Sequence, residues 1–170
     1  MNQQLSEVAI INGWTVLAHP CFEEQLKTLI EQVEAEKVRS PESYQGKSCT
    51  KLLSVVLKVI YQGIAVAPSS NDYRQGKTLG ANHKHWRRAK FGAGRHRLFF
   101  RYSAKDKIII LAWMNDEDTL RARGSKSDAY RVFERMLSSG YPPDDWDKLV
   151  AASEESRYLV GALRVVGGKK

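Results

Sequence analysis

The first half of the chain carries one strand pattern followed by two helical patterns. In Asn12–Ala18 apolar side chains occupy alternate positions, which predicts a short strand. From Pro20 to about Lys37 the apolar residues instead recur every three or four positions, as on one face of a helix. A second amphipathic helix is predicted from about Gln45 to Gln62, with Gly63 as its stop signal. We expect these two helices to form a hairpin.

The middle of the chain predicts a long loop and then a β-meander. Gly63–His85 contains Pro, Ser, Asn and Gly and is longer than an ordinary connection, which is typical of functional loops. Short turns divide the next segment into three predicted strands: Trp86–Phe91, Arg95–Ser103 and Lys107–Asn115. The third contains the apolar run Ile108–Leu111, which favours a central strand buried on both faces.

The C-terminal part predicts two more helices. One is capped by Ser127, reaches Ser139 and places Tyr130 on its inner stripe. The other starts at Asp144 or Asp145 and runs to about Leu163. The patterns together predict an α+β fold: an antiparallel or mixed β-sheet with an N-terminal helical hairpin and C-terminal helices. We expect a single domain, 1–170, with a core at about 10–147 and a C-terminal helical extension at about 144–170.

Length and composition agree with one domain. A chain of 170 residues with 42% hydrophobic content can bury one core, whereas two independent cores would be cramped. We find no apolar run of about 18 residues and no basic segment before the mildly apolar start, so we expect neither a membrane span nor a signal peptide. The expected location is the cytoplasm. Cys21 and Cys49 then fit reduced, packed thiols better than a disulfide or a metal site.

Positive charge is concentrated in one window of the chain. Between Arg74 and Lys107 there are eleven Lys and Arg residues against one acid, Asp106, so this window carries a formal charge of +10. The other 136 residues sum to −2. Cations alternate with aromatic residues in WRRAKFGAGRHRLFFRY (86–102), a composition suited to a sugar-phosphate backbone and unstacked bases. The window therefore predicts a nucleic-acid partner.

Strand alternation predicts how these cations are arranged. Arg88 and Lys90 share one face of the first hairpin strand, and Arg97 and Arg101 share the corresponding face of the second. If the apolar residues between them pack against helices, the four cations point outward, where an anion would relieve their repulsion. The alternative is a solvated sheet face, but such faces usually mix both signs of charge. We therefore favour an anion site, with Lys84, His85, Arg87, Arg95 and Arg101 as RNA-binding residues.

The residue types in the window restrict the chemistry. A two-metal nuclease needs several carboxylates at the scissile phosphate, and the window offers only Asp106. RNA carries its own nucleophile in the 2′-hydroxyl, so cations that orient it and stabilise the phosphate can suffice. Arginine suits this task because its planar, permanently charged fork matches phosphate oxygens. We expect neither a metal nor another cofactor.

Proton transfer has several candidates. Lys90 lies among cations, and Tyr130 could serve if its hydroxyl reaches the basic face, although it could equally be a core aromatic. His83 and His85 have a spacing that could suggest a metal, but no carboxylate or cysteine is near them in sequence, so RNA contact is the favoured role. His96 alternates away from its arginine neighbours and has only a modest claim to a catalytic role.

Six stretches carry a resemblance to a known family. They are NGWTVLAHPCF, TKLLSVVLKVI, YRQGKTLG, WRRAKFGAGRHRLFFRYSAKDKIIILAWMNDEDTLR, SDAYRVFERML and GYPPDDW, which together span roughly residues 12–147. On these stretches the chain resembles the RelE-like bacterial toxins, and within them the YhaV-type branch.

The resemblance implies a RelE-like fold and assigns roles to residues. It implies that Arg88, Lys90, Arg97 and Tyr130 are catalytic, together with a basic residue before the last site helix. For that position Arg123 and Lys126 are both candidates, because the segment NDEDTLRARGSKS is longer here than in many members.

The resemblance also implies an activity and partners. The implied activity is metal-independent endoribonuclease cleavage of messenger RNA, often on the ribosome, by a toxin of a type II toxin-antitoxin system. The implied partner is a PrlF-type antitoxin, and operator DNA would be bound only through the toxin-antitoxin complex. The residues themselves leave two alternatives: a non-catalytic RNA-binding module that grips structured RNA, and a DNA-binding regulator, for which no recognition helix is found.

Overall fold

The computed structural model describes residues 10–76, 78–116, 128–155, 158–159 and 162. Its centre is a mixed sheet with the strand order β1-β2-β5-β4-β3, and β6 pairs with the outer edge of β2. The strands are β1 (Ile10–Ile11), β2 (Trp14–Ala18), β3 (Arg87–Phe91), β4 (His96–Ser103), β5 (Ile108–Met114) and β6 (Glu154–Glu155). The helices are α1 (Pro20–Arg39), α2 (Ser48–Lys58), α3 (Ala129–Ser139) and α4 (Trp146–Ala152). The α+β class predicted from the sequence is confirmed.

Strand β5 is the middle of the sheet, as its apolar run predicted. It pairs in parallel with β2 and antiparallel with β4, and all but the first of its side chains are buried. Strands β3 and β4 form the predicted hairpin, with Lys90 opposite Arg97 and Arg88 opposite Phe99. Its turn places Gly92, Ala93 and Gly94 at positive φ, the left-handed region in which glycine is favoured. The three predicted strands are thus confirmed to within one or two residues at each end.

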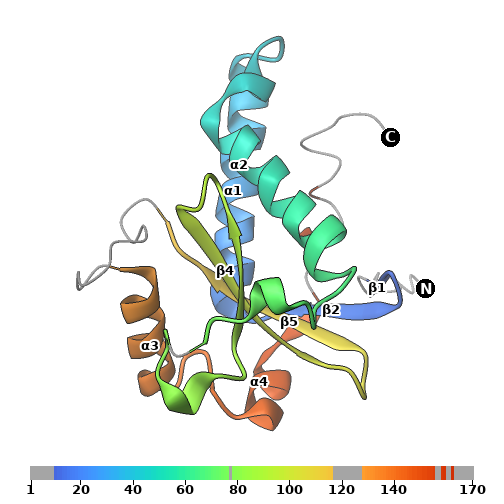
Figure 1. Cartoon of the computed structure of the whole chain (residues 1–170). Helices are drawn as coiled ribbons and strands as arrows, with labels where there is room; N and C mark the ends of the chain where they lie inside the picture. The colour runs from blue at the N-terminus through green and yellow to red at the C-terminus, as the bar shows by residue number, and fades with distance from the viewer. Residues whose placement is uncertain (1–9, 77, 117–127, 156–157, 160–161, 163–170) are drawn as a thin grey trace.

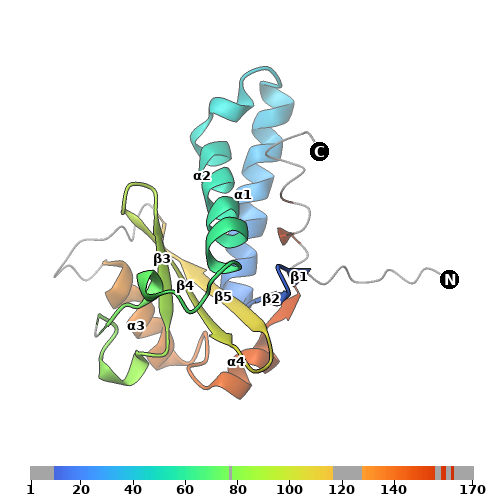
Figure 2. The same cartoon turned by 45° about the vertical axis from the view of Figure 1, so that its right-hand side comes forward.

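The predicted N-terminal helical hairpin is present. Helix α1 starts where the ring of His19 accepts a hydrogen bond from the backbone N–H of Cys21, with Pro20 at the first position. The second helix begins with a 3₁₀ turn (Tyr44–Gly46), continues as α2 and ends in a π-helical turn (Val59–Ile64). Figures 1 and 2 show α1 and α2 side by side, rising from the sheet.

Helices cover both faces of the sheet, and this corrects the predicted outward basic face. On one face, Leu98 and Phe100 pack with residues of α1 and α2. On the other, Phe99 packs with Trp86, Trp113 and the α3 residue Phe133. Strand alternation alone predicted that the second face is open, but α3 packs against it (Figure 1). The basic residues of this face therefore lie beside or under α3.

Two C-terminal predictions are wrong in detail. Helix α3 is capped by Asp128, whose carboxylate accepts from the backbone N–H of Tyr130; the predicted cap, residue 127, lies outside the described residues. Leu159 and Ala162 are helical again, but the continuous helix predicted to about residue 163 is interrupted, because α4 ends at Ala152. Beyond it the chain is extended at Ser153, and Glu154–Glu155 pairs with Leu17 and Ala18 at the end of β2. Strand β1 pairs only with the first half of β2, so the second half of that edge is available to β6. The chain therefore forms a short strand after α4 where a helix was predicted.

No helix among the described residues is long and apolar enough to cross a membrane. Cys21 and Cys49 form no disulfide and are both half-buried, so the packed-thiol prediction holds in a weaker form. Burial raises the pKa of Cys21 to about 11, which keeps the thiol protonated near neutral pH.

Candidate functional site

The hydroxyl of Tyr130 joins two of the predicted site arginines. Arg88 Nε donates to it at 2.9 Å and Arg97 Nε donates at 3.1 Å. These arginines come from adjacent strands of the β3–β4 hairpin, whereas Tyr130 comes from the first turn of α3. Three residues far apart in sequence therefore meet at one oxygen atom. We call Arg88, Lys90, Arg97 and Tyr130 the arginine-tyrosine cluster.

The ring of Tyr130 is fixed by the core, as one of the two sequence interpretations held, while its role in proton transfer stays a prediction. Only 4% of Tyr130 is exposed, and its ring meets that of Phe99 edge-on, with 5.5 Å between the centroids. Phe99 in turn stacks on Phe133 one helical turn further along α3, at 4.3 Å. The side chain is therefore a core aromatic whose hydroxyl reaches the basic residues.

Arg97 does not point outward as the sequence analysis assumed. It is 6% exposed, and its Nη1 donates to the carbonyl oxygens of Gly94 at 2.5 Å and His96 at 3.1 Å. Its guanidinium also lies over the Tyr130 ring, 5.8 Å from the centroid. The alternation of the strand placed it on the correct face, but α3 covers that face. Arg97 thus holds both the hairpin turn and the tyrosine.

Arg88 and Lys90 are more accessible. Arg88 is half-buried and donates from Nη1 to the carbonyl oxygen of Asp72 at 2.9 Å, so the long loop supports it. Lys90 is exposed and lies directly across the hairpin from Arg97. Within the described part of the chain, no carboxylate pairs with Arg88, Lys90 or Arg97. Positive charge at this cluster is therefore not neutralised by acids there.

The predicted RNA-binding residues do not form one surface. Arg87 lies on the opposite face of β3, over the ring of Tyr102 at 5.2 Å. Lys84 and Arg95 are exposed, one before β3 and the other in the hairpin turn. The basic window therefore divides over both faces and both ends of the hairpin.

Arg101 is packed rather than presented to solvent. Its guanidinium lies between the rings of Trp86 and Trp146, at 5.7 and 5.2 Å, and donates to the carbonyl oxygen of Asp144 at 2.7 Å. Burial lowers the pKa of Arg101, and the carboxylates of Asp144 and Asp145 oppose that shift. Its contacts are those of a residue that holds α4 against the sheet.

Sequence reasoning missed Asp144, which gathers the two histidines of the loop. One of its oxygens lies 3.0 Å from His83 Nδ1, 2.8 Å from His85 Nε2 and 2.8 Å from Trp86 Nε1. Partial burial would raise the pKa of Asp144, but the hydrogen bonds from these three donors outweigh it and hold the pKa below its usual range. We call His83, His85, Trp86 and Asp144 the histidine-aspartate cluster.

Three other candidates lie away from the arginine-tyrosine cluster or outside the described residues. His96 stacks on Phe91, with 5.1 Å between the ring centroids, which agrees with its modest claim to a catalytic role. Arg123 and Lys126 fall in the segment 117–127, outside the described residues, so the choice between them stays a prediction.

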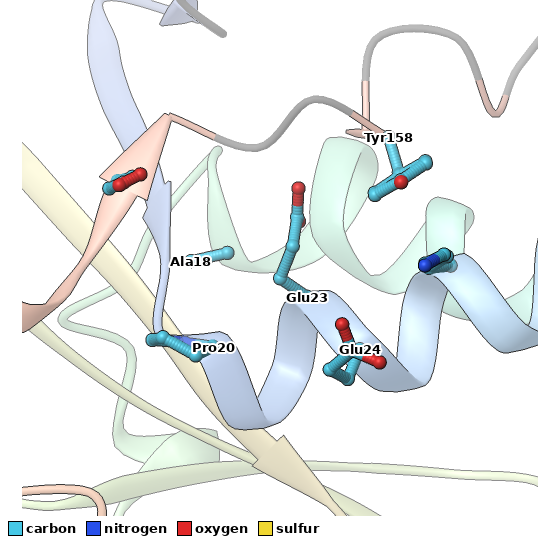
Figure 3. A pocket seen from close by; sticks show the side chains of 7 residues that line it. Ala18, Pro20, Glu23, Glu24 and Tyr158 are labelled. Atoms are coloured by element: carbon cyan, nitrogen blue, oxygen red, sulfur yellow. The ribbon is translucent and has the colours of Figure 1, made fainter.

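A pocket on the other side of the sheet does not suit a phosphate. It has a volume of about 310 Å³ and lies along the start of α1, beside β2 and β6 (Figure 3). Its lining includes Glu23, Glu24 and Glu154 against a single cation, Lys27. Carboxylates repel an RNA backbone, so the arginine-tyrosine cluster is the better place for phosphate chemistry.

The arginine-tyrosine cluster has the groups required for metal-independent phosphate chemistry. Arginine and lysine can stabilise the charge of a pentavalent phosphate, and a positioned phenol can transfer a proton. The same set cannot assemble a two-metal centre, because that centre is built from carboxylates.

Comparison with known proteins identifies a family described by endonuclease activity. The chain matches the YhaV toxin family, described as toxin with endonuclease activity, of toxin-antitoxin system, over residues 16–154. It is 58% identical over 147 residues to Toxin YhaV of Escherichia coli O6:H1 (strain CFT073), covering 86% of this chain and 96% of the relative. It is 56% identical, with the same coverage, to Ribonuclease toxin YhaV of Escherichia coli strain K12. No solved structure matches the chain.

The matched region contains all the residues of both clusters, since it runs from β2 to the start of β6. On the extent of this match and the identity to these relatives, the chain belongs to the YhaV family, the toxins with endonuclease activity of toxin-antitoxin systems.

Proposed function

We propose that this toxin is a metal-independent endoribonuclease that cleaves messenger RNA through the substrate's own 2′-hydroxyl. The observation that carries the proposal is the Tyr130 hydroxyl held by Arg88 and Arg97. The name of the K12 relative, a ribonuclease toxin, supports RNA as the substrate. The residue types of the cluster, three cations and a phenol, support cleavage without a metal, because a two-metal centre is built from carboxylates.

Each residue has a separate task in this mechanism. Arg88 and Lys90, the more accessible cations, bind the scissile phosphate and stabilise its added negative charge during in-line attack by the 2′-oxygen. Arg97 is a positioning residue, because its hydrogen bonds hold the turn and the tyrosine. A phosphorus–oxygen bond to the 2′-oxygen forms as the bond to the 5′-oxygen breaks, so the 2′-hydroxyl loses a proton to solvent water and the 5′-oxygen gains one from the protein.

Tyr130 is the donor of that second proton. A phenol oxygen accepts hydrogen bonds through its lone pairs, and both arginines use it as an acceptor. This arrangement favours the hydroxyl as a proton donor to the leaving 5′-oxygen rather than as the base that deprotonates the 2′-hydroxyl.

The biological setting of the proposal rests on the resemblance to RelE-like toxins. We infer a RelE-like fold formed by the whole chain as one domain, action in the cytoplasm, and cleavage of messenger RNA on the ribosome. A toxin of a toxin-antitoxin system implies an antitoxin. We propose that it is of the PrlF type and that the complex of the two proteins represses its own operon by binding operator DNA.

Purified chain tested on RNA with and without ribosomes decides between the mechanisms. We expect cleavage in the presence of EDTA, with products that end in a 2′,3′-cyclic phosphate or its hydrolysis products. Assays without ribosomes keep the chelator from acting on ribosome integrity. Strict dependence on added Mg²⁺ with 5′-phosphate products would overturn the mechanism. Expression without antitoxin separates the toxin from a non-catalytic RNA-binding module, which would leave transcripts intact.

A further inference from the structure

We propose that His83, His85 and Asp144 form a structural site for one Zn²⁺ ion. Each residue offers a ligand atom, and the three atoms lie within 4.8 Å of one another. Two of them, His83 Nδ1 and His85 Nε2, approach the same Asp144 oxygen at 3.0 and 2.8 Å. The site is separate from the cleavage chemistry and is proposed whether or not that mechanism holds.

The ligand atoms lie near metal-site spacings around the carboxylate oxygen, whereas the two ring nitrogens, within 4.8 Å of each other, close in when a metal binds. In a tetrahedral zinc site the bonds to nitrogen and oxygen are about 2.1 Å long, so neighbouring ligand atoms lie about 3.4 Å apart. The ring nitrogens here are slightly closer than that to the carboxylate oxygen. A metal that separates these atoms by a few tenths of an ångström replaces the hydrogen bonds, and each neutral ring then carries its proton on the other nitrogen.

The surroundings of Asp144 resemble the outer shell of a metal site. Trp86 Nε1 donates to the carboxylate and Arg101 donates to the backbone carbonyl of the same residue, so Asp144 is held from two sides.

The donor set and the exposure decide which ion fits. Two imidazoles with one carboxylate suit Zn²⁺, whereas Mg²⁺ and Ca²⁺ prefer sites built from oxygen alone. The side chains of His85 and Asp144 are each 37% exposed and that of His83 is 19% exposed. An ion can therefore enter from solvent, and water can complete its coordination.

The location indicates a structural purpose. His83 ends a 3₁₀ turn (Ala81–His83) of the long loop, whereas Asp144 lies just before α4. A bound ion would link these segments, which are about sixty residues apart in the chain. Trp86 leads directly into β3, which carries Arg88, so the link would hold the start of that strand.

Zinc alone, titrated into the tag-free, EDTA-treated full chain near neutral pH, tests the proposal without RNA. Calorimetry should show one Zn²⁺ per chain, and zinc should raise the melting temperature. His85→Gln and Asp144→Asn should each weaken binding at least about tenfold, the scale known even for outer-shell losses. The matched control Asp147→Asn removes an exposed acid three residues away and should bind zinc as the unmodified chain does.

Two results would overturn the site. One is no binding when zinc exceeds protein severalfold; the other is equal affinity in the unmodified chain and in a folded His85→Gln. If Asp144→Asn does not fold, as judged by circular dichroism, His83→Gln replaces it. Because His85 is exposed, its variant is expected to fold and keeps the comparison decisive.

Discussion

The two clusters attach C-terminal segments to the same hairpin, but they treat charge in opposite ways. In the arginine-tyrosine cluster, Arg88 and Arg97 meet at a neutral hydroxyl, and within the described residues no carboxylate pairs with them. In the histidine-aspartate cluster, the Asp144 carboxylate binds three hydrogen-bonding side chains, and the backbone carbonyl of Asp144 accepts a hydrogen bond from Arg101.

The difference shows which end of the hairpin is prepared for an anion. Cations that have no acidic partner retain a positive potential that can attract an anionic ligand. Donors that bind a carboxylate of the protein are already satisfied by it. Basic residues in one sequence window therefore divide into a cleavage end and a structural end. The variants below test this division.

Arg97→Ala is expected to have the largest effect, on both rate and stability. The change removes one of the two donors to the Tyr130 hydroxyl and the hydrogen bond to the Gly94 carbonyl. Misplacement of a catalytic group can lower the rate about 10²-fold, and the tyrosine and turn carbonyl lose partners at a cost of about 1–3 kcal/mol. Single-turnover cleavage below the melting temperature measures the rate, and urea unfolding measures the stability. A folded variant with the original rate would remove Arg97 from the site.

Tyr130→Phe should lower the rate with a smaller effect on stability. The ring that packs on Phe99 remains, so the core is kept, but the proton donor is lost and the Arg97 Nε loses its acceptor. We expect a fall of about 10- to 1000-fold, the scale of positioned acid-base groups. Tyr102→Phe is the matched control, since it removes a hydroxyl from the opposite face of β4. Equal rates for both variants would make Tyr130 a core aromatic only.

Arg101→Met should lower stability and leave the rate of the folded protein unchanged. The guanidinium packs between Trp86 and Trp146 and donates to a carbonyl, and these contacts together are worth about 1–3 kcal/mol. Methionine keeps much of the apolar contact but removes the charge. Urea unfolding measures the loss of stability, and single-turnover cleavage at a temperature where the variant is folded measures the rate. A loss of rate comparable to that of Tyr130→Phe would break the division of the hairpin into two ends.

Sequence patterns predicted the elements well where the signals are local. Alternation and short turns defined β3, β4 and β5 to within one or two residues, because each strand is a continuous run between turn residues. The end of the last helix was missed because pairing with β2 is a long-range contact that overrides helical preference. Strand alternation likewise placed Arg97 and Phe99 on one face, but it could not show that α3 covers them.

The candidate site was predicted in part for the same reason. The position of Tyr130 followed from the resemblance, and the structure adds the hydrogen bonds that join it to the arginines. Asp144 had no local signal: it lies 58 residues from Trp86 in sequence, and only the folded chain brings it to the histidines. Clusters assembled from distant segments need tertiary structure, whereas a face of one strand does not.

Lys90→Ala should have the smallest effect, and it tests whether the cleavage end meets phosphate directly. Lys90 is exposed, has no hydrogen bond or ion pair among the described residues, and lies across the hairpin from Arg97. Its loss should leave stability unchanged, lower the cleavage rate less than Arg97→Ala does, and weaken RNA binding mainly at low salt. Each phosphate contact on single-stranded RNA contributes about 0.7 to the slope of log affinity against log salt, so the slope should fall by about that amount. Lys105→Ala, an exposed cation in the β4–β5 turn, should keep the original slope if phosphate is bound at the arginine-tyrosine cluster. If the two variants reduce the slope equally, RNA is held by the general charge of the basic window, and the arginine-tyrosine cluster would lose its claim to the phosphate.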